Sequence, residues 1–284
     1  MFKVNFIEVS NMVGIARQMP VLHLAACNQA LTTYRSNILR HSALVGLPGY
    51  ASLTSMAWAT SSVQAQHEIF GIREVSQAEV EANLPKLHHR LTELMDQKMQ
   101  GTEDQKRELM TKLTLQFQDF AGRSGQVYQD VLETVLKSIL VLAWGTFEAL
   151  TEDLLTGVIE ETPSLFATVN TGKLRFTRRN QFREAYEKSF AADLAIMTAV
   201  NNQTIDALSL IRNLLVHKSG LVDERFQKES VSIPQLAPFN SLAVGEAIRI
   251  DGKTVAALVD PTLESGYALI ESVDAWLMNH RTKL

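Results

Sequence analysis

Three polar residues near the end of a predicted helix have the side-chain types needed for acid–base chemistry at a phosphate. They are Arg212, Asn213 and His217, in a six-residue run that is otherwise leucine and valine. Histidine titrates near neutrality, arginine is a fixed cation with planar donors, and a polar amide can orient either of them. Metal-free cleavage of RNA needs such a set, because protons must move while charge develops on the phosphate.

The helix that carries this cluster is predicted to run from Thr204 to His217 and to end at Gly220. At 100° per residue, the polar positions fall on one face of the helix and the apolar positions fall on the other. A structural role fits the same spacing, because a histidine in a last turn stabilises the helix dipole and an edge arginine pairs with surface carboxylates. The polar face comprises Asp206, Ser209, Asn213 and His217, with Arg212 at its edge.

The elements around this helix predict a mainly α fold. Apolar residues recur at helical spacing from about Val127 to Glu161, and residues 180–190 form a short helix. Asp251-Gly252 is the preferred two-residue turn and predicts a small β-hairpin over Glu246–Val259. Pro261 is then expected to precede a final helix that ends near His280.

The cluster and its surroundings together resemble a known family. Arg212 and Asn213, three further residues, His217, and then Gly220 and Asp223 are similar to the signature of HEPN-domain proteins, an all-α family with many ribonucleases. Upstream, Ala143-Trp-Gly-Thr-Phe-Glu-Ala-Leu150 resembles the long-helix segment that packs against the motif helix in that family. The resemblance covers about residues 125–284 and implies a HEPN-like helical bundle.

The resemblance also implies a mechanism and a partner. HEPN ribonucleases are typically dimers in which two motif helices meet, so we expect a homodimer or a higher homo-oligomer. His217 would transfer protons between the ribose 2′-OH and the leaving 5′-oxygen, and Arg212 would stabilise charge on the phosphate. Asn213 would orient the phosphate or the imidazole. The products would be a 2′,3′-cyclic phosphate and a 5′-hydroxyl, and no metal or other cofactor would be needed.

Two carboxylates are candidates for supporting roles. Glu148 lies on the long helix, where an acidic residue can face the cleft in this family, and an ordinary surface charge explains it equally well. Asp206 shares the polar face of the motif helix. The neighbouring pair His88-His89 is not expected to bind metal, because adjacent helical residues point about 100° apart.

A basic segment with interleaved aromatic residues is the candidate RNA contact. Phe176 and Phe182 could stack on bases, while the alternative is that both are core residues and the cations are merely solvated. Net charge is −4, so the chain has no global basic field and an RNA contact must come from a local patch. The cations of this segment are Lys173, Arg175, Arg178, Arg179 and Arg183.

The N-terminal region, 1–122, is predicted to form a separate helical region of unknown role ahead of a HEPN-like domain at 123–284. Phe2, Val4 and Phe6 alternate with polar residues and indicate a short strand. Helices are expected over 21–44, 52–70, about 76–98 and about 102–121; Leu47-Pro48-Gly49 should end the first, and capping boxes begin the last two.

The bulk properties restrict the compartment. Cys27 is the only cysteine, so an intrachain disulfide and a cysteine-based zinc site are excluded. The N-terminus lacks the basic start and apolar core of a signal peptide, and no apolar run approaches the roughly 20 residues that span a bilayer. We therefore expect a cytoplasmic protein with no membrane contact.

Three functions fit the sequence. The first is a metal-independent endoribonuclease that acts in bacterial defence or as a toxin, a role that comes from the resemblance alone. The second is a non-catalytic HEPN module that binds RNA, nucleotide or a protein partner. The third is a helical scaffold whose residues 1–120 recognise a partner or trigger. An inhibitor or trigger protein is an additional expected partner for the first of these.

Overall fold

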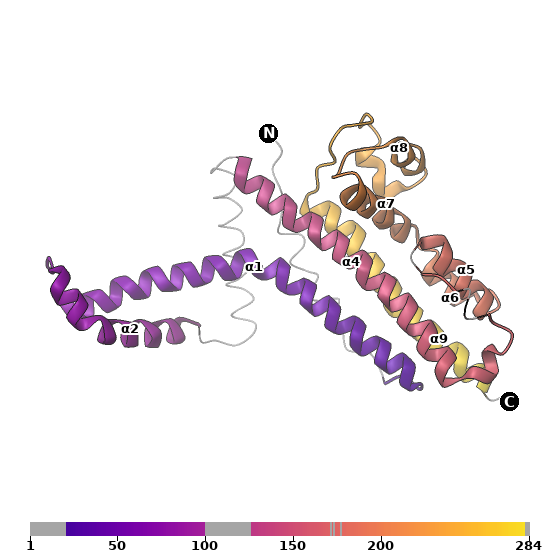
Figure 1. Cartoon of the computed structure of the whole chain (residues 1–284), viewed down its shortest axis with the longest axis horizontal. Coiled ribbons are helices and arrows are strands. Elements are labelled where there is room, and N and C mark those ends of the chain that lie inside the picture. Colours follow the sequence, from indigo (N-terminus) through magenta and orange to yellow (C-terminus); the bar gives the residue numbers. More distant parts are fainter. Residues whose placement is uncertain (1–20, 100–125, 171, 173, 177, 282–284) are drawn as a thin grey trace. The chain divides into compact units, whose positions relative to one another are not determined.

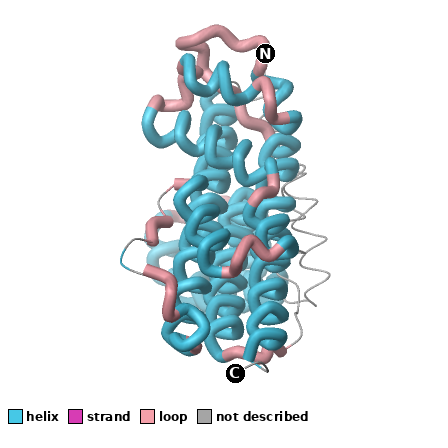
Figure 2. The backbone as a smooth tube through the Cα atoms, turned by 90° about the vertical axis from the view of Figure 1, so that its right-hand side faces the viewer, coloured by secondary structure: helices cyan, strands magenta, loops and turns pink. Residues whose placement is uncertain are grey.

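The computed structural model describes residues 21–99 and 126–281, apart from positions 171, 173 and 177. Helices and loops account for the described residues (Figure 2). The only extended pairing among them is one antiparallel bridge between Leu221 and Ala247. This confirms the prediction of a mainly α protein. The strand predicted at Phe2–Phe6 and the helix predicted at 102–121 lie outside the described residues.

The chain divides into two compact units. One unit comprises Met1–Val45 together with Gly125–Leu284, and the other is Gly46–Ser124. The sequence predicts a single boundary at 122/123, and the division after Ser124 lies close to it. The division after Val45 was not predicted. It groups the start of helix α1 (Ala25–Phe70) with the C-terminal helices and not with a separate N-terminal region.

Long helices form the centre of the first unit. Helices α4 (Gln126–Glu161) and α9 (Gly252–Arg281) lie side by side, and α7 (Gln203–His217) packs against both (Figure 1). Of the apolar stripe predicted for α4, Phe147, Leu150, Leu154 and Val158 are buried, whereas Val131 and Leu142 are exposed. The shorter elements are η2 (Pro163–Phe166), α5 (Arg179–Ser189), α6 (Leu194–Val200), α8 (Glu224–Ser230) and η4 (Pro234–Phe239).

Helix α4 is also apolar enough to invite a second interpretation. The stretch Gln129–Glu161 is long and apolar enough to cross a membrane, judged by length and composition, contrary to the expectation that no apolar run approaches this length. Half of its apolar window is buried by the rest of the protein, and core helices of soluble proteins pass the same test. The finding is therefore weak evidence for a span.

The start of α1 is fixed to α9 by hydrogen bonds. The buried Asp274 carboxylate accepts hydrogen bonds from the backbone N–H groups of His23 (2.9 Å) and Leu24 (3.0 Å). Its other oxygen lies 2.7 Å from His23 Nδ1. Further along, the Tyr34 hydroxyl donates to the Leu263 carbonyl at 3.0 Å. These bonds explain why residues predicted to be part of an N-terminal region belong to the C-terminal bundle.

Three predictions about where helices begin or end are wrong. The hairpin over Glu246–Val259 is absent, because the Asp251 carboxylate accepts the Thr254 N–H at 2.8 Å and helix α9 begins at Gly252. Pro261 lies inside α9, not ahead of it. Leu47-Pro48-Gly49 does not end a helix, since α1 is continuous through it. A turn signal is local, and the helical sequence on both sides outweighs it.

The second unit contains the remainder of α1 and helix α2 (Gln77–Met99). The predicted capping residue is confirmed on one side: Ser76 Oγ accepts the Glu79 N–H at 3.3 Å, whereas the Glu79 carboxylate pairs with Arg73. Arg90 of α2 donates to Glu68 of α1 at 2.6 Å and ties the two helices together. His88 and His89 are exposed on α2.

A half-buried carboxyl on α9 predicts a pH-dependent stability. One oxygen of Asp260 is buried without a hydrogen-bond partner among the described residues. Burial, and then the charge of Glu264, raise the pKa of Asp260 from 3.8 to about 6. The folded state therefore retains a proton that the unfolded chain has released, so this group's contribution to stability falls as pH rises from 3.8 to about 6 and is constant above that.

Asp260→Asn should therefore stabilise the protein above pH 6 and change little in acid. We expect the free energy of unfolding to rise by about 1 kcal/mol at pH 7.5, a value reduced for the partial exposure of the group. Urea denaturation of both proteins at pH 7.5 and near pH 3.8 measures the difference in the free energy of unfolding at each pH. An equal effect at both pH values would show that ionisation of Asp260 is not the cause.

Candidate active site

Helix α7 has well-defined ends that place His217 in its last turn. At the start, the Asn202 side chain accepts the Thr204 N–H at 2.9 Å. At the end, the Gly220 N–H donates to the Leu214 carbonyl at 2.9 Å, and Gly220 has a φ of +78°, which favours glycine. The predicted helix and its glycine terminator are thus confirmed.

The structure brings the three residues of the predicted cluster into direct contact. Arg212 Nη1 donates to Asn213 Oδ1 at 3.1 Å and lies 3.2 Å from His217 Nε2. Because a guanidinium can only donate, this contact requires Nε2 to carry its lone pair, so the proton of the neutral ring is assigned to Nδ1. One arginine nitrogen therefore orients both the amide and the imidazole.

The cluster lies at the boundary between core and solvent. Leu208, Ile211 and Leu214 of α7 are buried, whereas Arg212 and Asn213 are half-buried and His217 is exposed. Arg212 Nε is itself buried and has no hydrogen-bond partner among the described residues. The other terminal nitrogen, Nη2, makes no hydrogen bond within the described residues, so it is the donor left for a bound phosphate.

A pocket of about 570 Å³ opens beside the cluster. This volume is within the range of roughly 300–1,000 Å³ that is typical of small-ligand sites. Cationic side chains from several elements surround it, with a single carboxylate among the lining residues. Its walls include Trp144, Arg178, Arg179, Asn180, Ser209, Arg212, Asn213, His217, Lys218, Asp223 and Arg225.

Glu148 lies close enough to the cluster for its ionisation to be affected by Arg212. Burial raises the pKa of the Glu148 carboxyl, while the charge of Arg212 and the side chain of Trp144 act to lower it. Glu148 is half-buried on α4 and is not among the residues that line the pocket. The carboxyl is therefore close enough to Arg212 for their charges to interact.

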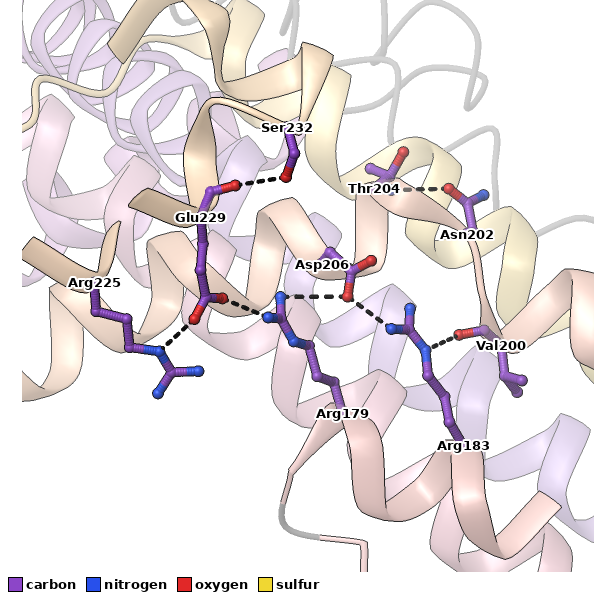
Figure 3. Close-up of polar contacts among 9 residues, drawn as sticks. All are labelled: Arg179, Arg183, Val200, Asn202, Thr204, Asp206, Arg225, Glu229 and Ser232. Carbon is purple, nitrogen blue, oxygen red and sulfur yellow. Dashed lines mark hydrogen bonds and ion pairs between the residues drawn. The ribbon is translucent and has the colours of Figure 1, made fainter. Parts of the chain in front are cut away.

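The other predicted supporting carboxylate, Asp206, is engaged elsewhere. Its Oδ1 lies 2.9 Å from Arg183 Nη1 and 3.3 Å from Arg179 Nη1. Glu229 of α8 in turn binds Arg179 and also Arg225, whose Nε donates to it at 2.8 Å. Figure 3 shows these five side chains as one ladder, which ties α5, α7 and α8 together. Asp206 is a partner of arginines here and does not contact His217.

The ladder includes two arginines of the basic segment that was predicted to contact RNA. Arg179 and Arg183 are neutralised by carboxylates, and Arg183 Nε also donates to the Val200 carbonyl at 2.9 Å. Arg175 donates to two backbone carbonyls and lies on a different pocket, while Lys173 lies outside the described residues. Arg178 is exposed, lines the pocket beside the cluster and has no ion pair among the described residues. No other described cation of this segment combines these three properties.

The aromatic residues of the basic segment belong to the core. Phe176 is 7% exposed and Phe182 is fully buried, with its ring 5.8 Å from Phe147 and 6.4 Å from Trp144. Rings packed in this way are not available to stack on bases. Of the two readings that the sequence left open, the core reading holds for both phenylalanines.

Several pocket residues were not predicted as site residues. Arg225 lies on α8, Lys218 follows α7, and Asp223 caps α8 by accepting the Phe226 N–H at 2.8 Å. Asp223 belongs to the motif quoted for the HEPN resemblance and Lys218 directly follows His217, so their position in the sequence was a usable signal. Arg225 had no such signal, because its position depends on how α8 folds back beside α7.

No group of three or more His, Cys, Asp or Glu side chains within the described ranges is arranged to hold a metal ion. Comparisons with protein-family models, with curated protein sequences and with solved structures found no match. The function must therefore be argued from the site itself.

Proposed function

We propose that this protein is a HEPN-type endoribonuclease that cleaves RNA without a metal ion. The observation that carries the proposal is the 3.2 Å contact between Arg212 Nη1 and His217 Nε2 on the wall of a cationic pocket. In this proposal His217 transfers protons and Arg212 binds the phosphate, and their 3.2 Å contact supports a shared role at one phosphate. Asn213 holds the same arginine nitrogen from the other side.

The geometry supports the following sequence of steps. A phosphate that binds Arg212 draws the guanidinium away from His217 and leaves the Nε2 lone pair free. Nε2 then accepts the proton of the ribose 2′-OH while the 2′-oxygen attacks phosphorus. The bond from phosphorus to the 5′-oxygen breaks, and Arg212 stabilises the charge on the phosphate oxygens. The 5′-oxygen takes up a proton, giving a 2′,3′-cyclic phosphate and a 5′-hydroxyl.

A second chain would complete this site. One cluster supplies a single histidine, whereas the reaction needs a base for the 2′-OH and an acid for the leaving oxygen. Val216, next to His217, is 47% exposed, and Leu221 is 43% exposed just beyond the helix. Apolar side chains of this kind beside the cluster would be covered in a dimer in which two α7 helices meet. The acid is then the histidine of the second chain.

One observation favours the alternative of binding without cleavage. In this structure His217 Nε2 already accepts from Arg212, so the pocket offers cations to a phosphate but no free base until that contact is exchanged. A module that binds RNA or nucleotide would need only the cations. The two functions differ in whether bound RNA is cut.

The test uses purified full-length protein incubated with RNA in the presence of EDTA. We expect cleavage that leaves 2′,3′-cyclic phosphate ends, and His217→Ala should lower its rate at least 100-fold, because general acid–base catalysis contributes about 10²–10⁴-fold. The ends are identified by mass spectrometry of a short substrate.

Controls separate the proposal from its alternative. The exposed His88→Ala variant removes a histidine far along the sequence from the cluster and should cleave at the wild-type rate. Cleavage that survives His217→Ala, or that requires Mg²⁺, contradicts the mechanism. RNA that binds but stays intact supports the binding module. Sedimentation of the active preparation completes the test, since an active monomer would contradict the two-chain site.

A further inference from the structure

A second group of donors lines the pocket apart from Arg212. Arg178 precedes the first turn of α5, and Arg225 lies in the first turn of α8. Neither residue belongs to α7, so these cations are brought to the pocket by other elements. Arg178 has no ion pair within the described part of the chain and is exposed. Its whole guanidinium is therefore available to a ligand.

Arg225 is anchored by one nitrogen, and its two terminal nitrogens are left as donors. Its Nε donates to Glu229 Oε1 at 2.8 Å, while its two terminal nitrogens have no partner within the described residues, and its side chain is 65% exposed. Burial alone would raise the pKa of Glu229, but the hydrogen bonds and charges of Arg225 and Arg179 lower it below the ordinary value. Glu229 is thus an ionised anchor, and Arg225 presents its terminal fork to solvent.

The balance of charge around the pocket leaves an excess of positive charge. The ladder in Figure 3 sets the three arginines 179, 183 and 225 against the two carboxylates of Asp206 and Glu229. Beyond it, the pocket adds Arg178, Arg212 and Lys218 against Asp223 alone. Asp223 is itself engaged with the Phe226 N–H. The cations exceed what a single phosphate at Arg212 would neutralise.

We infer that the pocket binds two consecutive phosphates of one RNA strand, the scissile one at Arg212 and a neighbouring one at Arg178 and Arg225. This inference rests on the proposed function and specifies its substrate. The planar forks of two arginines match the oxygens of a phosphodiester, and their contact with the backbone is independent of base sequence. The substrate is therefore an oligonucleotide with a phosphate next to the cut, and a dinucleoside monophosphate is a poor one.

The Arg179 side chain is a positioning residue in this arrangement. Both of its terminal nitrogens are engaged, one by Asp206 and one by Glu229. It thereby ties the helix start that follows Arg178 to the helix that carries Arg225. Arg179 and its two carboxylate partners thus hold Arg178 and Arg225 at a fixed spacing.

The test uses DNA oligonucleotides that contain one ribonucleotide, so that only one bond can be cut. In two matched substrates the scissile phosphate is kept, and either the next phosphate on its 5′ side or the next one on its 3′ side is replaced by an uncharged methylphosphonate. Wild-type protein should cut the fully charged substrate about tenfold faster than one of the two neutral ones, the size expected for loss of a charged hydrogen-bonded contact. A wild-type ratio of one with both replacements overturns the inference.

Two variants assign the effect to the named residues. Arg178→Gln and Arg225→Gln should each reduce the ratio of charged to neutral substrate toward one. Arg40→Gln is the matched control, because Arg40 is an exposed arginine of the same unit that does not line the pocket. If the ratio is unchanged in Arg178→Gln and Arg225→Gln, or falls equally in Arg40→Gln, the inference is wrong.

A binding experiment separates this inference from the proposed function. An all-DNA oligonucleotide lacks the 2′-OH and cannot be cut, so its affinity reports phosphate contacts alone. Arg178→Gln and Arg225→Gln should each lower the slope of log affinity against log salt by about 0.7, the value for one phosphate of a single strand. If RNA is not cut but these slopes fall, the two-phosphate site stands and the ribonuclease proposal fails. If RNA is cut and the slopes are unchanged, the ribonuclease proposal stands and the two-phosphate site fails.

Discussion

Replacing Arg212 by lysine is expected to slow RNA cleavage at least about 100-fold, the loss typical of removing one donor that stabilises developing charge. The substitution keeps the positive charge and removes only the planar fork. In the structure one nitrogen of that fork contacts both Asn213 Oδ1 (3.1 Å) and His217 Nε2 (3.2 Å), while Nε is buried and unpaired. A lysine has one nitrogen at the end of a flexible chain, so it lacks the planar pair of nitrogens that can donate to two phosphate oxygens side by side.

The measurement is single-turnover cleavage of a short RNA, alongside thermal unfolding of each protein. Arg212→Lys should unfold near the wild-type temperature, because the side chain is only half-buried. The matched control is Arg40→Lys, an arginine-to-lysine change at an exposed position, which should leave the rate unchanged. A wild-type rate in Arg212→Lys would show that positive charge alone suffices and that the contacts to Asn213 and His217 have no role in the reaction.

The part of the site that lies on one helix could be predicted from the sequence. Arg212, Asn213 and His217 are within six residues on α7, and helical periodicity places Asn213 and His217 one turn apart on one face with Arg212 at its edge. The terminator at Gly220 follows from the same local rules. Local spacing determines this geometry, so no knowledge of the rest of the fold is needed.

The contacts between elements could not be predicted in the same way. Asp206 shares the polar face of α7 with His217, and spacing indicated a common site. In the folded chain Arg179 and Arg183 of α5 pack beside the start of α7 and engage Asp206 there. The basic segment was therefore counted as free cations when two of its members are paired. Periodicity predicts which face a residue lies on but not which other helix that face meets.

The false hairpin has a different physical origin. Asp251-Gly252 suits a two-residue turn, and an aspartate suits equally well the position before a helix. The apolar residues that follow, Val255, Leu258 and Val259, are all buried at helical spacing. Burial of that stripe against the bundle selects the helix, and Asp251 then caps it at Thr254. The long-range packing decides between two local signals of similar strength.

Replacing Gly266 by alanine should destabilise the protein by about 3 kcal/mol, because extra atoms in a packed core force side chains and backbone to shift. A Cβ added at Gly266 of α9 would lie 2.2 Å from the Tyr34 hydroxyl oxygen and 2.4 Å from its Cζ. The Tyr34 ring cannot move aside easily. It is buried, its hydroxyl donates to the Leu263 carbonyl, and its edge packs against Tyr267 with ring centroids 5.3 Å apart.

Urea denaturation of Gly266→Ala and of Gly145→Ala gives the sharpest comparison, because both replace a glycine in a long helix of the same unit. A Cβ at Gly145 meets nothing within 4 Å, so that variant should be more stable by about 0.5–1 kcal/mol through helix propensity. Combining Gly266→Ala with Tyr34→Leu should cost less than the sum of the single changes, since the truncated side chain no longer fills the space that Cβ needs. Additive costs, or a Gly266→Ala variant as stable as Gly145→Ala, would show that α1 does not pack against α9 at Tyr34. In that case residues 25–45 would not belong to the C-terminal bundle.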